Sequence, residues 1–298
     1  MAAVQSTPRI DVAGRAARRA PATGPRVDWR LTAPLALTYL VFFLTPLGLL
    51  FWISLYDDIE LTRMGGSQWV EFLGDAFYRG VVFDTLKLGV TTILFSTVLA
   101  YPLGLVFCAT GPRLQRVLLF VILLPLLLSV VVRTFAWIVI LAREGLLNQT
   151  LLWLGLTSTP VSLLQTELGL VISLSQIEMP LMLLPLLTVM RQIDPNLIDA
   201  SRALGASRWR TFFRVILPLS LPGWIAGATL VFASSTTAFI SQSVIGGARL
   251  VYLPALIWQQ AMVVYNWPFA AVASVILLVT VLVGITLLGL LGRFARTL

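Results

Sequence analysis

Two ionisable side chains lie inside long apolar stretches of the sequence and are its first candidates for chemistry. Arg133 precedes Thr134 in one stretch, and Glu178 falls near the middle of another. A charge at the centre of a helix in lipid costs about 3 kcal/mol on insertion scales, so such residues usually face a cavity or one another. Three interpretations stay open: Glu178 attracts a cationic group along a path, Arg133 and Glu178 form a structural pair, or the two pack independently.

Other polar side chains in the apolar stretches are candidates for lining the same path. Gln176 lies two residues before Glu178. Ser235 and Thr236 belong to a polar cluster that is followed by Phe239 and Gln242. Hydrogen bonding between helices is the alternative role for such residues, and it is the commoner one.

The residue types that are absent exclude most enzymatic chemistry. The sequence contains no histidine and a single cysteine, Cys108, which excludes Ser-His-Asp catalysis, histidine metal sites and an internal disulfide. Lys87 is the only lysine, so no GxxxxGK[ST] phosphate-binding loop is present. We therefore expect no catalytic residue, no metal ligand set and no cofactor bound by this chain.

Composition indicates a protein that crosses a membrane several times. Apolar residues make up 58% of the 298 residues and charged residues 11%, and a soluble domain has a charged fraction of about 25%. The net charge of +8 is a topology signal rather than a nucleic-acid signal, because the arginines fall in the tails and between the apolar stretches. The predicted environment is a lipid membrane, with no nucleic-acid partner.

Six apolar stretches are long enough to cross a bilayer, which takes about twenty residues. We predict spans at about 33–55, 85–110, 117–141, 168–190, 221–245 and 269–291. The run at 146–156 is too short to cross and is predicted to form a short helix at the outer interface. Of the 21 basic residues, 15 fall in the two tails, the loop after the second span and the loop after the fourth. This bias predicts an all-α polytopic protein with both termini in the cytosol.

The same features divide the chain into four parts. Residues 1–30 form a basic tail whose low apolar content indicates disorder in the cytosol. Residues 31–82 hold the first span and an external, acidic loop. Residues 83–292 form a core of five spans that includes a cytosolic loop at 191–218, and residues 293–298 form the cytosolic end.

The loop before the fifth predicted span contains a polar stretch with two helix starts. Asp194 can cap a first helix, and Pro195 suits its first position. Gly205 is a natural stop in the left-handed conformation. Ser207 can cap a second helix, which we expect to end at Pro218. The sequence therefore predicts a helix–turn–helix that lies on the membrane surface.

The first of these helices has a face of small residues that would let another protein approach closely. Ala200, Ser201, Ala203 and Gly205 form this face. The arginines of the stretch would keep the helix out of the bilayer. The alternative is an ordinary amphipathic helix in a loop.

The spacing of Asp199-Ala200-Ser201, Gly205 and Leu217-Pro218 resembles the cytoplasmic coupling loop, or EAA motif, of permease subunits in ATP-binding-cassette importers. Asp199 stands where Glu is usual, and Ser201 stands for Ala. The resemblance implies a type I ABC importer permease fold and a separate ATPase that holds the ATP and Mg²⁺. It assigns the docking on that ATPase to Asp199, Ala200, Ser201, Ala203, Leu204, Gly205, Ala206, Leu217 and Pro218.

Four longer segments narrow the resemblance. GLLNQTLLWLG, DASRALGASRWRTFFRVILPLSLPG, IGGAR and YNWPFAAVAS are similar, in this order, to the first permease subunit of spermidine/putrescine importers. This resemblance implies a complex in the bacterial inner membrane with a second permease, two ATP-binding subunits and an extracytoplasmic solute-binding protein. The implied solute is a polyamine or a related cationic compound.

Other solutes and one other class of protein stay open. Related permeases would carry thiamine, ferric ion, a phosphonate or an opine. A secondary transporter is the alternative class, although no inverted repeat is visible in the sequence.

Overall fold

The computed structural model describes the backbone of residues 29–294 and the side chains of residues 33–292. Within these residues the chain is helical and forms no β-strand; one isolated bridge joins Tyr56 and Met64. The chain divides into two compact units, residues 1–48 and 49–298. Most of the predicted basic tail at 1–30 and of the predicted cytosolic end at 293–298 lies outside the described residues.

The first unit contains most of α1 (Trp29–Ile53), which corresponds to the first predicted span. Its sequence is apolar throughout and includes Pro34 and Pro46. Both prolines are accommodated without a break, as is common in helices of membrane proteins. The hydroxyl of Thr38 donates to the carbonyl of Pro34 at 2.8 Å, which pairs one of the groups near this proline.

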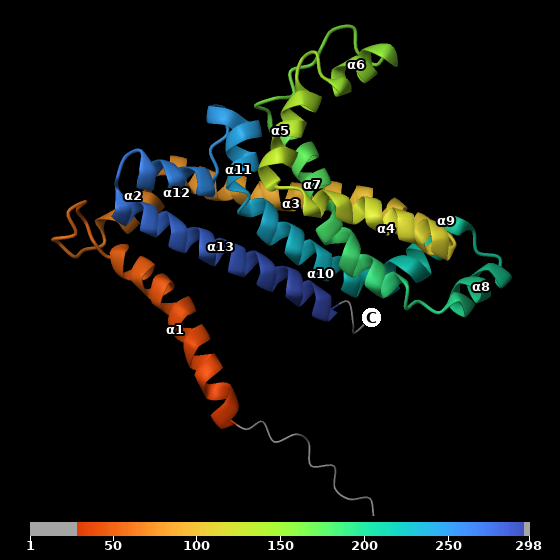
Figure 1. Cartoon of the computed structure of the whole chain (residues 1–298), viewed down its shortest axis with the longest axis horizontal. Helices are drawn as coiled ribbons and strands as arrows, with labels where there is room; N and C mark the ends of the chain where they lie inside the picture. Colours follow the sequence, from red (N-terminus) through yellow and green to blue (C-terminus); the bar gives the residue numbers. More distant parts are fainter. Residues whose placement is uncertain (1–28, 295–298) are drawn as a thin grey trace, which may run out of the picture. The chain divides into compact units, whose positions relative to one another are not determined.

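The second unit holds all the remaining helices (Figure 1). They are α2 (Ser67–Gly74), α3 (Ala76–Ala109), α4 (Pro112–Leu127), α5 (Val130–Leu141), α6 (Leu146–Trp153), α7 (Glu167–Met190), α8 (Pro195–Ala203), α9 (Arg208–Thr211), α10 (Leu217–Thr236), α11 (Phe239–Ser241), α12 (Leu253–Met262) and α13 (Trp267–Phe294). Two π-helical segments, Phe212–Ile216 and Gln242–Gly246, and a 3₁₀ turn, Gly247–Arg249, connect some of them. Helices are present where the fourth and sixth spans and the short helix at 146–156 were predicted.

Helix α7 is at the centre of this unit and packs against α3 and α10 (Figure 1). Two glycines one turn apart, Gly223 and Gly227, form a GxxxG pattern on α10 that allows close packing of helices in membranes. A Cβ atom added at Gly223 would lie 2.8 Å from the carbonyl oxygen of Pro185, and one at Gly227 would lie 2.7 Å from that of Met182. The backbones of α7 and α10 therefore meet without side chains between them.

Three clusters of buried apolar residues hold the second unit together. The largest joins α3, α7 and α10 and includes Tyr101, Leu183 and Phe232. A second joins the outer parts of α5 and α7 to the segment after α11. The third packs α2 and the start of α3 against α12 and α13.

The third predicted span, at about 117–141, was wrong as a single helix. It is broken at Leu128 and Ser129 into α4 and α5, and the segments Pro112–Leu127 and Val130–Trp153 meet at 101°. Pro125 lacks the N–H that would continue the ladder, and its carbonyl accepts instead from the N–H of Leu128 at 3.2 Å. Pro125 thus lies in the last turn of α4, close to the break.

The fifth predicted span, at about 221–245, was also wrong in its outer part. Helix α10 ends at Thr236, and the chain starts again as the short α11 and a π-helical turn. The side-chain amide of Gln242 donates to the carbonyls of Ser235 at 2.8 Å and Thr236 at 3.3 Å. These are carbonyls that a helix end leaves unpaired, so a side chain seven residues away makes the break possible.

Two of the segments that were predicted to be external differ from the prediction as well. Helix α3 begins at Ala76, nine residues before the predicted start of the second span, because Asp75 caps it by accepting from the N–H of Phe77 at 2.7 Å. The outer segment before the sixth span contains α12, which has Pro254 in its first turn, where a missing N–H costs nothing.

The number of spans stays a prediction. Five helices among the described residues are long and apolar enough to cross a membrane, and the number rises to as many as seven if each of two bent helix pairs is one span. The predicted six spans lie within this range, and the cytosolic placement of both termini stays a prediction.

Candidate functional site

The predicted helix–turn–helix is present, and its caps are confirmed; we call residues 194–211 the elbow. The carboxylate of Asp194 accepts from the N–H of Asn196 at 2.9 Å at the start of α8. Gly205 has φ +79°, the left-handed conformation that ends the helix. The hydroxyl of Ser207 accepts from the N–H of Arg210 at 3.3 Å at the start of α9.

The sequence predicted that the second helix of the elbow ends at Pro218, and this prediction was wrong. Helix α9 continues through the π-helical turn Phe212–Ile216 into α10. The N–H of Leu217 donates to the carbonyl of Phe212, five residues earlier. Pro218 therefore falls where π-helical bonding changes to α-helical bonding, and its missing N–H interrupts no regular ladder.

One hydrogen bond joins the two helices of the elbow. The hydroxyls of Ser201 on α8 and Thr211 on α9 lie 3.0 Å apart, and Thr211 is only 3% exposed. The ring of Phe212, the next residue, meets the ring of Tyr101 on α3 edge to face at 5.8 Å between centroids. The elbow is therefore fixed internally and against the long helix α3.

Most of the predicted docking set is exposed, whereas Leu217 is partly buried against the largest apolar cluster. No side chain of α8 is buried. Leu204 is 89% exposed, Ala200, Ala203 and Gly205 are also exposed, and Ala206 is half-buried. No atom lies within 4 Å of the position of a Cβ at Gly205. Among the described residues, Ala200, Ala203, Leu204 and Gly205 are therefore left exposed, whereas Ser201, the remaining member of the small face, is partly covered by its contact with Thr211.

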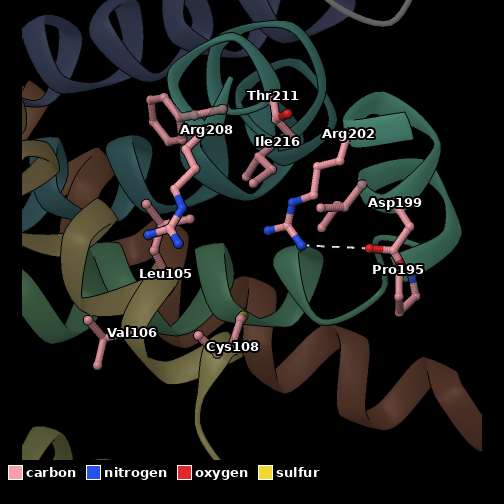
Figure 2. Close-up of a pocket in the computed structure, with 12 residues that line it drawn as sticks. Leu105, Val106, Cys108, Pro195, Asp199, Arg202, Arg208, Thr211 and Ile216 are labelled. Carbon is pink, nitrogen blue, oxygen red and sulfur yellow. Dashed lines mark ion pairs between the residues drawn. The ribbon is translucent and has the colours of Figure 1, made fainter. Parts of the chain in front are cut away.

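A pocket of about 600 Å³ lies between the elbow and the last turns of α3 (Figure 2). Leu105, Val106, Cys108 and Ala109 line it from α3, and Pro195, Ile198, Asp199, Arg202, Arg208, Thr211, Phe212 and Ile216 line it from the other side. Arg202 and Asp199 form an ion pair at 3.7 Å. Both side chains are largely exposed, so this pair contributes little to stability.

Arg133 and Glu178, the two ionisable residues predicted inside the membrane, lie near each other. Glu178 on α7 is 7% exposed. Ser234 and the charged Arg133 are polar neighbours of its side chain. Arg133 donates from Nη1 to the carbonyl of Ile177 at 3.3 Å. The ion pairs found among the described residues do not include one between Arg133 and Glu178.

The other predicted path residues make contacts within the chain. The hydroxyls of Ser235 and Thr236 are buried and donate to the carbonyl of Phe232 at 3.3 and 2.7 Å. Gln176 accepts from the indole N–H of Trp137 at 3.0 Å, and Phe239 packs on Trp258 at 5.9 Å. Gln242 caps α10, and its side-chain oxygen is buried without a hydrogen-bond partner.

Two polar contacts between helices were not predicted. The hydroxyls of Thr134 on α5 and Ser241 on α11 lie 3.0 Å apart, both fully buried. Lys87 on α3 forms an ion pair with Glu167 on α7 at 2.8 Å. No local sequence pattern indicates either contact, because the partners lie 80 or more residues apart.

The helical arrangement is found in solved importer structures. A bacterial ABC transporter involved in the import of the acidic polysaccharide alginate contains a chain that matches this one with a TM-score of 0.70 at 18% identity, covering 91% of this chain and 96% of that chain. The MetNI methionine ABC transporter matches with a TM-score of 0.52 at 22% identity, covering 73% and 94%. The fold is that of an ABC importer permease.

Residues 97–297 match the family described as the binding-protein-dependent transport system inner membrane component. The chain belongs to this family: it is a permease subunit in the inner membrane, and ATP is hydrolysed by a separate subunit of such importers.

Curated relatives agree with this assignment. The chain is 31% identical over 256 residues to the spermidine/putrescine transport system permease protein PotB of Haemophilus influenzae, which covers 83% of this chain and 87% of that protein. It is 33% identical over 214 residues to PotB of Escherichia coli, covering 72% and 77%. The molybdenum transport system permease protein ModB of Escherichia coli is 34% identical over 173 residues, covering 56% and 71%.

Proposed function

We propose that this permease forms, with a second permease, the path through the membrane for spermidine, putrescine or a related cationic solute. The similarity to PotB extends over most of the chain and supports this solute class. The acidic side chain of Glu178 on α7 supports it as well, because an ionisable residue inside a membrane helix usually serves a function and a negative charge there attracts a cationic group. ModB, which is named for molybdenum transport, shows that relatives carry other solutes.

We also propose that the elbow docks on the separate ATPase from the cytosolic side. The uncovered small face of α8 carries this proposal: its caps and the Ser201–Thr211 hydrogen bond shape the elbow without any partner, while Leu204 stays 89% exposed. An element that is folded without a partner and still exposes an apolar side chain fits a docking role. The docking set is the one that the sequence indicated, from Asp199 to Ala206 with Leu217 and Pro218.

The proposed complex has six spans in this chain, cytosolic termini, two permeases, two ATPases that bind ATP and Mg²⁺, and an extracytoplasmic binding protein at the outer loops. Closure of the ATPases would displace the elbow as a rigid body. Because α9, the π-helical turn and α10 form one uninterrupted helix, the displacement would pass directly to α10. Helix α7 would follow, since its backbone contacts Gly223 and Gly227. The permease pair would then alternate between an inward-open and an outward-open state, because ATP binding and hydrolysis favour one state over the other.

Two glycines allow a matched test of the docking. Gly205 and Gly155 both have positive φ, +79° and +68°, and both have open space where a Cβ would lie. Gly205→Asp places a charge on the proposed docking face, whereas Gly155→Asp imposes the same backbone strain on the segment after α6. We expect both variants to insert, and only Gly205→Asp to lose the ATPase on mild detergent extraction. Normal ATPase recovery and normal uptake with Gly205→Asp would contradict the docking assignment.

The solute is tested separately, by uptake of labelled spermidine and putrescine into vesicles that contain the whole importer. Unlabelled thiamine, ferric ion, a phosphonate and an opine serve as competitors. Competition by polyamines alone is the expected result, and competition by one of the others would replace the solute without affecting the docking proposal. Uptake that persists without the ATPase would favour a secondary transporter.

A further inference from the structure

The pocket between the elbow and α3 is unlike an ordinary packing gap, because its two walls differ in character. Leu105, Val106 and Ala109 form an apolar wall on a helix that is long and apolar enough to span a membrane. The opposite wall contributes two guanidinium groups, from Arg202 and Arg208. We call this the arginine pocket, and its volume of about 600 Å³ is that of a small-molecule site.

Both guanidinium groups point into the same space (Figure 2). Arg202 is paired with Asp199 at 3.7 Å, whereas Arg208 forms no ion pair with the residues that the structure describes. Asp199 is the only acidic side chain that lines the pocket. The lining therefore keeps an excess of positive charge, and planar guanidinium groups match the oxygens of a phosphate in pairs.

We propose that the arginine pocket binds the headgroup of an anionic phospholipid of the cytosolic leaflet, such as phosphatidylglycerol. Basic pockets at the cytosolic side of membrane helices favour such headgroups. The phosphate lies between Arg202 and Arg208, and an acyl chain follows the exposed side of α3 at Val106, which is 51% exposed. This inference uses the cytosolic placement of the elbow proposed above, but it does not depend on the solute or on ATPase docking.

Charge and surroundings favour a lipid over the other available occupants. A basic segment such as the arginine-rich sequence at 1–30 would not neutralise the positive charge of the pocket. A free phosphate would satisfy the guanidinium groups and leave the α3 wall exposed. A bound lipid covers both walls and links α8 to α3. No side chain of α8 is buried by the chain itself, so the lipid adds a contact that holds the elbow in place.

Cys108 lines the pocket and is the only cysteine of the chain, which makes it a built-in reporter. The experiment measures the rate of Cys108 alkylation by a small maleimide in the whole importer, reconstituted in phosphatidylglycerol or in phosphatidylcholine and read by peptide mass. Native mass spectrometry counts the phosphatidylglycerol retained. The variants are Arg202→Gln/Arg208→Gln and, as a control, Arg210→Gln, an exposed arginine of α9 that does not line the pocket.

We expect phosphatidylglycerol to slow alkylation in the wild type and in Arg210→Gln, and not in the double variant. Since each basic group near an anionic surface is worth a factor of about five in affinity, the double variant should bind phosphatidylglycerol about thirtyfold more weakly. Equal protection in the double variant would overturn the proposal. So would protection by inorganic phosphate in phosphatidylcholine, which indicates a free anion, or protection that disappears only when the ATPase is removed, which indicates a protein side chain.

Discussion

The hydroxyl of Ser201 on α8 lies 3.0 Å from the hydroxyl of Thr211 on α9, and this contact is the side-chain hydrogen bond that joins the two helices of the elbow. Ser201 stands where the related coupling loops usually have alanine. Serine at this position affects stability differently from alanine, because the buried Thr211 needs a hydrogen-bond partner for its hydroxyl.

Ser201→Ala should destabilise the permease by about 1–3 kcal/mol, because it leaves the buried Thr211 hydroxyl without a partner. The double variant Ser201→Ala/Thr211→Val removes both polar groups and should recover most of this loss. Thermal unfolding of the purified importer in detergent measures both effects. Losses that simply add would show that the two hydroxyls do not depend on each other.

Gly227→Ala should separate α7 from α10 and lower stability by about 1–3 kcal/mol, as overpacking does. Its Cβ would lie 2.7 Å from the carbonyl oxygen of Met182, a backbone atom that cannot move aside. Gly289→Ala is the matched control on α13, where nothing lies within 4 Å. Alanine there should raise stability by about 0.5–1 kcal/mol. Equal melting temperatures for the two variants would contradict the close packing.

Arg133 donates to the carbonyl of Ile177, and the ion pairs among the described residues do not include one with Glu178. The path role of Glu178 and the structural pair therefore both stay predictions, which substitution can separate. Glu178→Gln should reduce uptake of a cationic solute about tenfold or more while the complex still assembles. The exchange Arg133→Glu/Glu178→Arg should not restore uptake. Transport by the exchanged pair at the wild-type rate would show that the two residues stabilise each other and would remove Glu178 from the path.

The turn after α1 should loosen in acid. Hydrogen bonds from Ser67, first from its hydroxyl and then from its backbone N–H, lower the pKa of Asp57 below its ordinary value of 3.8. A lowered folded pKa means that the stabilisation is complete above the ordinary value and is lost as pH falls through the folded pKa. Hydrogen exchange at Ser67, corrected for its intrinsic rate, should therefore increase below pH 3.8.

Asp57→Asn is the control for this pH effect, because the amide still accepts from Ser67 but does not titrate. Its hydrogen exchange at Ser67 should stay level over the same range. A wild-type profile that is equally level would mean that the Asp57 carboxylate does not hold the turn.

The caps and the turn of the elbow could be predicted because they are encoded locally. Asp194, Gly205 and Ser207 act on backbone groups two or three positions away, and the sequence shows those positions directly. Helix α7 was predictable for a similar reason: 24 apolar-rich residues between a Thr166 cap and Met190 leave little choice in a membrane.

The broken spans could not be predicted, since proline alone does not decide where a membrane helix breaks. Pro180 and Pro185 lie inside the unbroken α7, whereas Pro125 comes just before the end of α4. Helix α10 ends where Gln242 reaches back to its last carbonyls. Residues that only tertiary structure brings together decide such outcomes, and the path residues share this difficulty.

A π-helical turn carries one residue more than an α-helical turn. The single extra residue in Phe212–Ile216 therefore sets everything before it roughly 100° further around the axis of α10 than a regular helix would. This one inserted residue sets the direction around the helix axis in which the elbow and its exposed Leu204 face. Deleting one residue there should rotate the elbow about the axis of α10 and leave its internal structure unchanged.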